Sequence, residues 1–214
     1  MSHKKHFLKV NRSLLYEKLN CLKNFWRSCK GPVAVGFSGG VDSSFLLITG
    51  IKWCNYPVYP FSLISLFLTD EAVHAIDKIA LEIGIKPIKL YWNPLHFDKI
   101  RQNSIYRCYF CKKELYTIIK NKAQLKGCDI VVDGTHFGDL SKFRPGINAL
   151  LENGIQLPLV RCKFEKDEIR FLLEKWKYSF WDKNAESCLA TIFNYGYELN
   201  EEDFKNIGHM CKNN

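Results

Sequence analysis

The stretch PVAVGFSGGVDSSFLLITG, residues 32–50, places serines and glycines between a short apolar run and a longer one. The first run predicts a short buried strand, and residues 41–53 predict a helix. Glycine permits a tight turn between them and leaves backbone N–H groups uncovered. Ser38, Ser43 and Ser44 add hydroxyl donors, and the helix directs its positive end toward the turn. This turn is therefore suited to bind a phosphate group.

The turn differs from the P-loop of kinases and GTPases. That loop requires Gly, four residues and then Gly-Lys-Ser/Thr, whereas this turn contains no lysine. The three letters SGG alone would favour a simple tight connection over a binding site. The interpretation therefore depends on the residues around the turn and on the rest of the chain.

Strand-like and helix-like segments alternate along the chain. After the first pair, strands are expected at residues 59–68, 86–92, 128–135 and 179–183, and helices at 69–84, 105–125 and 166–176. This alternation predicts an α/β fold, a doubly wound parallel sheet with helices on both faces. Ligands of such sheets bind beyond the carboxyl ends of the strands. Residues 38–44 and 133–146 follow the first and fourth strands, so we expect them to meet at that edge.

The composition predicts a soluble globular protein. Of the 214 residues, 47% are hydrophobic, which is enough for a sizeable core. The apolar runs are shorter than the roughly 18 residues of a membrane span, and the basic N-terminus lacks the apolar stretch of a signal peptide. We therefore expect a cytoplasmic protein without membrane contact. The formal charge of +9 fits either a lysine-rich solvated surface or an anionic partner such as a nucleotide, an acidic metabolite or RNA.

Nine cysteines are many for a cytosolic protein. Because no secretion signal is present, they predict no disulfide framework. Cys21, Cys29 and Cys54 fall in or near helical segments and are expected to be packing thiols. Only Cys108 and Cys111 have the spacing of metal ligands.

The six residues SGGVDS match the SGGxDS signature of the PP-loop ATP pyrophosphatases, which cleave ATP between its α and β phosphates. The resemblance implies that Ser38, Gly39, Gly40 and Ser43 hold pyrophosphate. It also implies that Asp42 helps to bind ATP and its Mg²⁺. These enzymes adenylate a carbonyl or carboxylate oxygen, and AMP then leaves when a nucleophile attacks.

Three further stretches resemble motifs of the LarE-like sulfur transferases. YRCYFCKKELY at residues 106–116 is close to RCYxCKxxL, DGTHFGDLSKFRPG at 133–146 is close to DGTxxDDLxxxRPG, and WDKNAESCLAT at 181–191 is close to WxKPAxxCLAS. Together with the ATP turn, they stand in the family's order over residues 32–196. The resemblance implies a PP-loop, HUP-like Rossmann-type fold and ATP-dependent transfer of sulfur.

The resemblance also assigns roles to residues outside the ATP turn. It implies that Lys112 faces nucleotide phosphate and that Asp133, Gly134 and Asp139 line the site. It places Arg144 beside the adenylated substrate.

In this family pattern, Cys108 and Cys111 match the cysteine pair of cluster-bearing members, and Cys188 matches the reactive cysteine. A C-x-x-C at a helix start presents two thiolates to one metal, and a distant third cysteine completes three ligands. A [4Fe–4S] cluster held by three thiolates leaves one iron free to bind hydrosulfide. In the family's other mechanism, the cysteine gives up its own sulfur and becomes dehydroalanine; the presence of all three cysteines favours the cluster. Structural zinc is a further alternative, with Cys162 or one of the six histidines, such as His136, as a fourth ligand.

The chain departs from the family pattern in two places. Where the family continues into RFPYG, this chain has Ile192 and Asn194 in place of the arginine and the proline. Family members carry an additional C-terminal domain, whereas eighteen residues (214 − 196) follow Gly196. We expect an N-terminal helix in residues 1–30, a PP-loop domain in 31–196, and a short C-terminal helix or tail in 197–214.

These observations predict an AMP- and pyrophosphate-forming sulfur transferase that uses a sulfide donor and a small-molecule acceptor, and that forms a weakly held homo-oligomer. Two alternatives remain. Thiolation of tRNA would use the positive charge, although no paired C-x-x-C hairpins of an RNA-binding module are visible. A nucleotide or iron–sulfur binding protein without catalysis is suggested by the replaced arginine.

Overall fold

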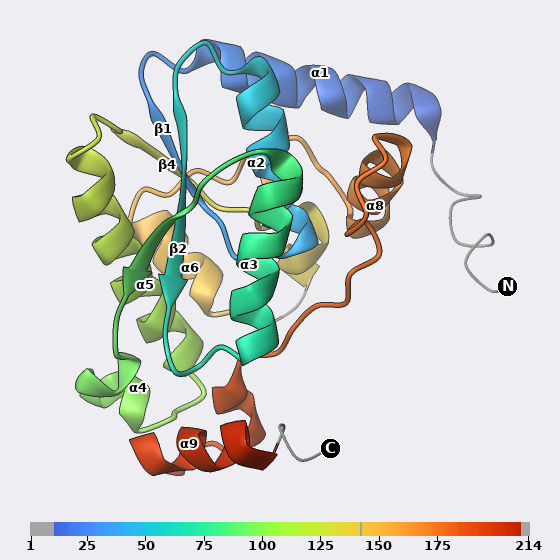
Figure 1. Cartoon of the computed structure of the whole chain (residues 1–214). Helices are drawn as coiled ribbons and strands as arrows, with labels where there is room; N and C mark the ends of the chain where they lie inside the picture. The colour runs from blue at the N-terminus through green and yellow to red at the C-terminus, as the bar shows by residue number, and fades with distance from the viewer. Residues whose placement is uncertain (1–10, 142, 211–214) are drawn as a thin grey trace, which may run out of the picture.

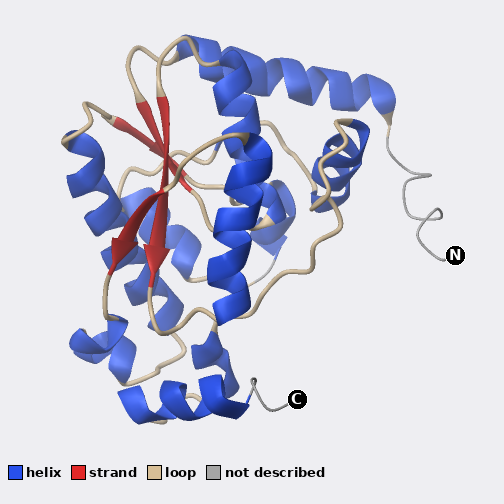
Figure 2. Cartoon of the chain, viewed as in Figure 1, coloured by secondary structure: helices blue, strands red, loops and turns tan. Residues whose placement is uncertain are grey.

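The computed structural model describes residues 11–141 and 143–210. Its centre is a four-stranded sheet of β1 (Val33–Gly36), β2 (Val58–Ile64), β3 (Ile88–Tyr91) and β4 (Ile130–Val132), shown in Figure 2. The strand order is β3-β2-β1-β4, and all neighbouring pairs are parallel. The predicted doubly wound α/β fold is confirmed.

Helices join the strands and cover the sheet (Figure 1). The longer helices are α1 (Arg12–Ser28), α2 (Val41–Trp53), α3 (Asp70–Ile83), α5 (Arg107–Gln124), α8 (Lys166–Lys175) and α9 (Glu201–Met210). The shorter ones are α4 (Asp98–Arg101), α6 (Gly146–Glu152) and α7 (Pro158–Arg161), with 3₁₀ turns η2 (Pro94–His96), η3 (Phe137–Ser141) and η4 (Leu189–Ile192). No helix of the described residues is long and apolar enough to cross a membrane.

The two faces of the sheet bury different helices, because successive side chains of a strand point to opposite faces. Val33 and Val35 of β1 lie in a core with α1, α2, α3 and α8. Ala34, between them, lies in a second core with α5 and α6. This alternation places α2 and α5 on opposite faces of the sheet. The amino ends of both helices lie at the carboxyl edge of the sheet, where the strands end.

A third apolar cluster lies beyond the carboxyl edge of the sheet. It buries Phe67, Leu95, Ile100, Ala190, Leu199 and Phe204, with Cys111 and Cys188 packed against it. The backbone N–H of Leu189 donates to the carbonyl of Phe67 at 3.0 Å, which holds η4 against the segment after β2. This cluster joins the C-terminal part of the chain to the edge of the sheet.

The predicted strand at residues 179–183 is wrong. The segment forms a turn in which the N–H of Lys183 donates to the carbonyl of Phe180 at 3.1 Å. Phe180 is buried in the core between sheet and helices, so the apolar side chain is satisfied by packing and needs no strand pairing.

Helix α1 packs against α2 and α7, and Cys21 of α1 forms a disulfide with Cys162, which follows α7. The two Cα atoms lie 5.7 Å apart although 141 residues separate them in sequence. Two predictions are therefore wrong. Cys21 is disulfide-bonded rather than a free packing thiol, and Cys162 is not available as a fourth zinc ligand. Cys29 is a buried free thiol, as expected, and Cys211 lies outside the described residues.

Candidate functional site

The serine-glycine turn connects β1 to α2 in a conformation that requires glycine. Gly39 has a φ of +67°, and a Cβ there would lie 3.0 Å from the backbone of Ile76 in α3. The Ser38 and Ser43 hydroxyl groups lie 3.1 Å apart, and the Ser38 N–H donates to the Ser43 hydroxyl at 3.2 Å. The N-cap of α2 is Gly40, which has no side chain, so the first N–H groups of the helix face the turn without a capping side chain. This arrangement fits an anionic ligand.

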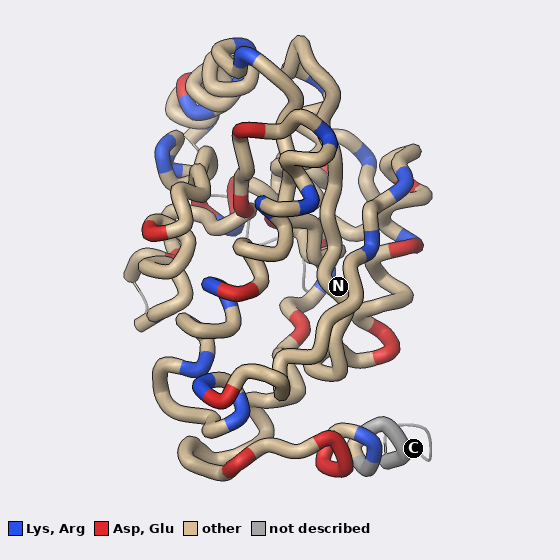
Figure 3. The backbone as a smooth tube through the Cα atoms, turned by 90° about the vertical axis from the view of Figure 1, so that its left-hand side faces the viewer, with Lys and Arg blue, Asp and Glu red and all other residues tan. Residues whose placement is uncertain are grey.

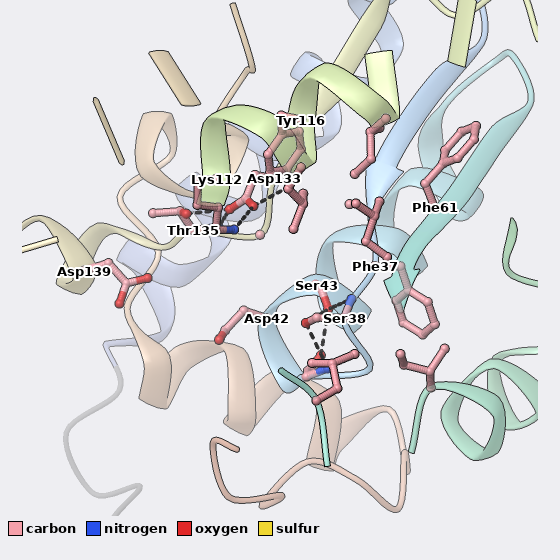
Figure 4. Close-up of a pocket in the computed structure, with 18 of the residues that line it drawn as sticks. Phe37, Ser38, Asp42, Ser43, Phe61, Lys112, Tyr116, Asp133, Thr135 and Asp139 are labelled. Atoms are coloured by element: carbon pink, nitrogen blue, oxygen red, sulfur yellow. Dashed lines mark hydrogen bonds and ion pairs between the residues drawn. The ribbon is translucent and has the colours of Figure 1, made fainter. Parts of the chain in front are cut away.

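A pocket of about 310 Å³ lies in front of this turn (Figure 4). Most of the sequence-predicted residues line it, namely Ser38, Gly40, Asp42, Ser43, Lys112, Asp133, Gly134, Asp139 and Arg144. Gly39 shapes the turn without lining the pocket, and Cys108, Cys111 and Cys188 are outside its lining. The structure therefore brings three separate chain segments, predicted from sequence, to one cavity.

The loop after β4 touches the turn directly. A Cβ on Gly134 would lie 2.8 Å from the backbone of Ser43. Real Cβ atoms do not approach backbone atoms that closely, so only glycine permits this contact without a shift of the chain. The loop after β4 therefore packs directly against the start of α2.

Asp133 is the centre of a buried polar network. Lys112 donates to its Oδ2 at 3.0 Å, Tyr116 donates to the same oxygen, and the Thr135 N–H donates to its Oδ1 at 2.7 Å. Burial alone would raise the pKa of Asp133, but Lys112 and the hydrogen bonds from Thr135 and Tyr116 outweigh it and lower the pKa to about 2. Figure 4 shows Lys112, Tyr116 and Thr135 around this carboxylate. The network holds the ammonium group of Lys112 at the pocket.

Asp139 anchors the far side of the pocket. Its Oδ1 lies 3.0 Å from the guanidinium of Arg144 and 3.5 Å from Nε2 of His136. The backbone N–H of His136 donates to Oδ2 of Asp139 at 3.2 Å. In Figure 4 Asp42 lies between Asp139 and the Ser38–Ser43 pair. Arg144 thus shares the pocket with the turn, and His136 belongs to this loop.

A lysine that sequence analysis missed approaches the turn from another helix. Lys166, at the start of α8, forms an ion pair with Oδ2 of Asp42 at 2.6 Å across 124 residues of chain. The start of α8 is held by a capping box of Glu165 and Glu168, and Glu168 pairs with Lys18 of α1 at 2.7 Å. Local sequence contains no signal for this contact, because Lys166 resembles any charged residue at the start of an amphipathic helix.

The other oxygen of Asp42, Oδ1, is buried and has no hydrogen-bond partner among the described residues. A buried carboxylate oxygen without a partner is costly, and a hard cation such as Mg²⁺ prefers carboxylate oxygen. The chemistry of this residue therefore fits a metal-bound nucleotide at the turn.

The three predicted ligand cysteines are neighbours at the amino end of α5. Burial raises the pKa of Cys111 to about 12, and the nearby thiols of Cys188 and Cys108 contribute to the shift. Burial also raises the pKa of Cys188, and Cys108 adds to it. Cys108 itself is exposed. Cys111 and Cys188 both pack against the third apolar cluster, and Cys108 lies one helical turn before Cys111 on α5.

A buried arginine joins the two cysteine segments. Arg107 is 2% exposed and donates to the carbonyl of Ala190 at 2.6 Å and to the Asn103 side chain. Its guanidinium also lies 3.9 Å from the sulfur of Cys108. Arg107 therefore fixes η4, which directly follows Cys188, to the start of α5.

In the part of the chain that the structure describes, no three His, Cys, Asp or Glu side chains are arranged to hold a metal ion. The donor set is nevertheless chemically suited to an iron–sulfur cluster, since three neighbouring thiols supply soft ligands. Of the fourth ligands expected for zinc, Cys162 is disulfide-bonded and His136 contacts Asp139.

Three curated relatives match most of the chain, whereas no family model matches it. The uncharacterized protein slr1717 of Synechocystis sp. is 30% identical over 195 residues, covering 91% of this chain and 72% of the relative. The uncharacterized protein MJ0830 of Methanocaldococcus jannaschii is 32% identical, covering 89% and 71%. The pyridinium-3,5-bisthiocarboxylic acid mononucleotide synthase of Lactiplantibacillus plantarum is 28% identical over 176 residues, covering 82% and 64%. The chain is a LarE-like member of the PP-loop ATP pyrophosphatase superfamily.

Solved structures of PP-loop enzymes share the fold. The NMN synthetase of Francisella tularensis superposes with a TM-score of 0.60 at 15% identity, covering 94% of this chain and 85% of that chain. The U34-tRNA thiolase NcsA of Methanococcus maripaludis, solved with its [4Fe-4S] cluster, superposes with a TM-score of 0.59 at 16% identity, covering 94% and 73%. The PP-loop fold is thereby confirmed.

In this LarE-like chain, three of the four stretches that carry the family resemblance line one pocket: the SGGVDS turn, the start of α5 and the DGT loop. The fourth, around Cys188, packs against the third apolar cluster beside Cys111. Ile192, at the position of the family's arginine, is 62% exposed at the end of η4. Tyr116, Thr135 and Lys166 extend the predicted site.

Proposed function

We propose that this LarE-like protein is an ATP-dependent sulfur transferase that forms AMP and pyrophosphate. The observation that carries the proposal is the double role of α5. Its first turns carry Cys108 and Cys111 beside Cys188, and one residue later Lys112 lines the pocket in front of the serine-glycine turn. A sulfur-bearing group and a nucleotide site are thus adjacent on one rigid helix.

In the first step, a carboxylate or carbonyl oxygen of the acceptor attacks the α-phosphorus of ATP. The bond from that phosphorus to the bridging oxygen breaks, and pyrophosphate leaves. Ser38, Gly40 and Ser43 donate hydrogen bonds to the pyrophosphate, and Asp42 provides carboxylate oxygen to Mg²⁺. Lys112, which lines the pocket, and Lys166, which pairs with Asp42, supply the positive charge that the turn itself lacks.

In the second step, a sulfur nucleophile from an external sulfide donor attacks the activated carbon. The carbon–oxygen bond to AMP breaks, and AMP leaves with the oxygen. Arg144, fixed by Asp139 at the pocket, binds the anionic acylphosphate that links acceptor and AMP. The two loops that hold Arg144 and the turn are in contact through Gly134, so both ends of the adenylate are positioned together.

Cys108, Cys111 and Cys188 would hold a [4Fe–4S] cluster in this proposal. When bound, such a cluster would supply one iron without a protein ligand and thus a binding position for an external sulfide. Arg107 fixes the two segments that carry these thiols. The alternative, in which Cys188 donates its own sulfur, uses the same placement; iron and sulfide analysis of anaerobically purified protein distinguishes the two.

The nucleotide site is tested by paired lysine variants on α5. Lys112 lines the pocket, whereas Lys113 is directed to Tyr109 and Glu152. Lys112→Met should weaken binding of magnesium α,β-methylene-ATP at least about tenfold, because a hydrogen bond to a charged group is worth roughly 1.5–3 kcal/mol. Lys113→Met is the matched control and should bind like the wild type. Equal affinity of both variants for this nucleotide would refute the proposed site.

Activity is tested by incubating the protein with ATP, sulfide and candidate carboxylate acceptors and by measuring pyrophosphate and AMP. The proposal expects stoichiometric release of both with formation of a thiolated acceptor. Release of ADP and phosphate would contradict it.

Thiolation of tRNA is the second candidate, favoured by exposed aromatic residues near the thiols. Tyr106 and Tyr195 are 52% and 66% exposed. The turn that carries Tyr195 is joined to Asn103 by the Gly196 N–H, which donates to the Asn103 carbonyl at 2.9 Å. Aromatic side chains stack on unpaired bases, and the charge of +9 attracts RNA. Co-purified tRNA with a thiolated base would support this candidate over a small-molecule acceptor.

A further inference from the structure

Asn103 lies in the turn between α4 and α5, in the left-handed region of the backbone. Its φ is +49°, and its exposed fraction is 0%. Apart from glycine, asparagine is one of the few residues that adopt this conformation without much strain. A buried polar side chain needs hydrogen-bond partners, and those of Asn103 come from α5 and from a segment near the end of the chain.

The polar groups of Asn103 join these two parts of the chain. Its Oδ1 accepts a hydrogen bond from the guanidinium of Arg107, in the first turn of α5. Its Nδ2 donates to the carbonyl of Asn194 at 2.9 Å, and its own carbonyl accepts the N–H of Gly196 at 2.9 Å. Arg107 adds a bond of 2.6 Å to the carbonyl of Ala190. We call these two residues the Asn103–Arg107 clamp.

The clamp ties the segment of Cys188 to the helix that carries the other two thiols. Ala190 and Asn194, whose carbonyls it binds, follow Cys188 by two and six residues (190 − 188 and 194 − 188). Cys108 and Cys111 lie in the first turns of α5, directly after the arginine of the clamp. Cys111 and Cys188 pack against the same third apolar cluster. The clamp thus connects the two segments whose thiols are neighbours.

The clamp binds the C-terminal segment through main-chain carbonyl oxygens. At Ile192 and Asn194 the chain departs from the LarE-like pattern, and both side chains are exposed. Because the clamp binds carbonyl groups, the side chains at these two positions do not enter it. The departure from the family pattern therefore leaves the connection between Cys188 and α5 in place.

A surface ion pair joins the same two parts of the chain and provides a contrast to the clamp. Figure 3 shows the C-terminal segment with α9 crossing the base of the molecule, with acidic residues along it. Glu198 of this segment lies 2.5 Å from the guanidinium of Arg101, and the two side chains are 63% and 40% exposed. A pair as exposed as this one contributes little to stability. The buried hydrogen bonds of the clamp therefore hold the segment more firmly than the surface pair does.

We propose that Asn103 is a positioning residue, which acts through Arg107 and through the carbonyls that follow Cys188 to hold the Cys188 thiol beside those of Cys108 and Cys111. Among the described residues, Asn103 is outside the lining of the nucleotide pocket, so its effect on the thiols is separable from nucleotide binding. That the positioned thiols serve sulfur transfer rests on the proposed function. The positioning itself does not.

The experiment measures how fast dibromobimane, which bridges two neighbouring thiols, joins Cys188 to Cys108 or Cys111 in the anaerobic full chain without metal. The bridged peptides are identified by mass spectrometry. Asn103→Gly keeps the left-handed backbone and removes the side chain, so it should slow the bridge at least about fivefold, since each lost hydrogen bond changes a local equilibrium by about 2- to 12-fold. Asn103→Asp keeps the acceptor for Arg107 and loses the donor to Asn194, and its rate should lie between the two.

Glu198→Gln is the matched control, because it removes the surface contact between the same two segments; its bridge should form at the wild-type rate. Binding of magnesium α,β-methylene-ATP is measured in every variant and should be retained, which shows that the chain is folded. A wild type that forms no bridge to Cys188, or an Asn103→Gly variant that binds nucleotide and bridges at the wild-type rate, would overturn the proposal. Loss of nucleotide binding in both Asn103 variants would also overturn it, since Asn103 would then support the whole fold. Should the bridges behave as expected while the wild type releases no AMP and pyrophosphate, the proposed function alone would fail.

Discussion

Replacement of Lys166 tests whether tertiary structure supplies the cation that the serine-glycine turn lacks. Its ammonium group lies 2.6 Å from Asp42, and the two side chains are 29% and 25% exposed. In Lys166→Met the positive charge disappears and the Asp42 carboxylate remains at the turn. A nucleotide phosphate that enters the pocket then loses one charged partner and meets an uncompensated negative charge.

The expected effects on binding and on folding differ in size. A hydrogen bond to a charged group is worth roughly 1.5–3 kcal/mol, so affinity for magnesium α,β-methylene-ATP should fall about 10- to 150-fold. The partly exposed ion pair contributes at most about 1 kcal/mol to folding, which shifts the melting temperature of a chain of this size by about 2–4 °C. Binding should therefore suffer far more than stability.

Calorimetric titration and thermal unfolding of the same samples measure both quantities. Lys166→Arg should retain part of the affinity, because it keeps the charge. Lys175→Met, in the last turn of α8, is the control and should bind like the wild type, because Lys175 packs over Phe171 away from the turn. Unchanged nucleotide affinity in Lys166→Met, or a fall in melting temperature beyond about 10 °C, would refute the assigned role and make Lys166 a structural residue.

Three further predictions concern the framework of the site. Gly134→Ala should destabilise the fold by about 1–3 kcal/mol in urea unfolding, because its Cβ would lie 2.8 Å from the backbone of the turn, whereas Gly31→Ala, with open space around it, should be neutral. The pKa of Asp133 is lowered from 3.8 to about 2, so its contribution of about 2–3 kcal/mol to the free energy of unfolding is complete above about pH 4 and is lost as the pH falls through 2. The difference in unfolding free energy between wild type and Asp133→Asn should therefore narrow as the pH falls over that range. A difference that stays constant would contradict the role of the Asp133 network. Reduction of the Cys21–Cys162 disulfide should lower the melting temperature by about 4–16 °C, corresponding to roughly 2–4 kcal/mol, and the Cys21→Ser variant should show no further change with reductant.

Part of the site follows from sequence because it depends on neighbours in the chain. The alternation of apolar segments predicts the parallel sheet, and the SGGVDS turn after β1 is a strand–turn–helix unit whose geometry is local. The loop after β4 is expected beside it, because carboxyl ends of parallel strands share one edge. Gly39 and Gly134 belong to these motifs, but the backbone that a side chain there would meet, at Ile76 and at Ser43, comes close only when the elements pack.

Tertiary structure alone decided which distant side chains complete the site. Lys166 reaches Asp42 across 124 residues of chain. Tyr116 donates to Asp133 from α5, which covers the face of the sheet opposite to α2. The sequence contains a lysine and a tyrosine on two amphipathic helices, but their targets depend on how those helices pack. The physical reason is that the spacing of apolar residues and the residues of a turn specify each helix or strand by itself. A long-range ion pair or hydrogen bond exists only after strand order and helix packing have brought two such elements together.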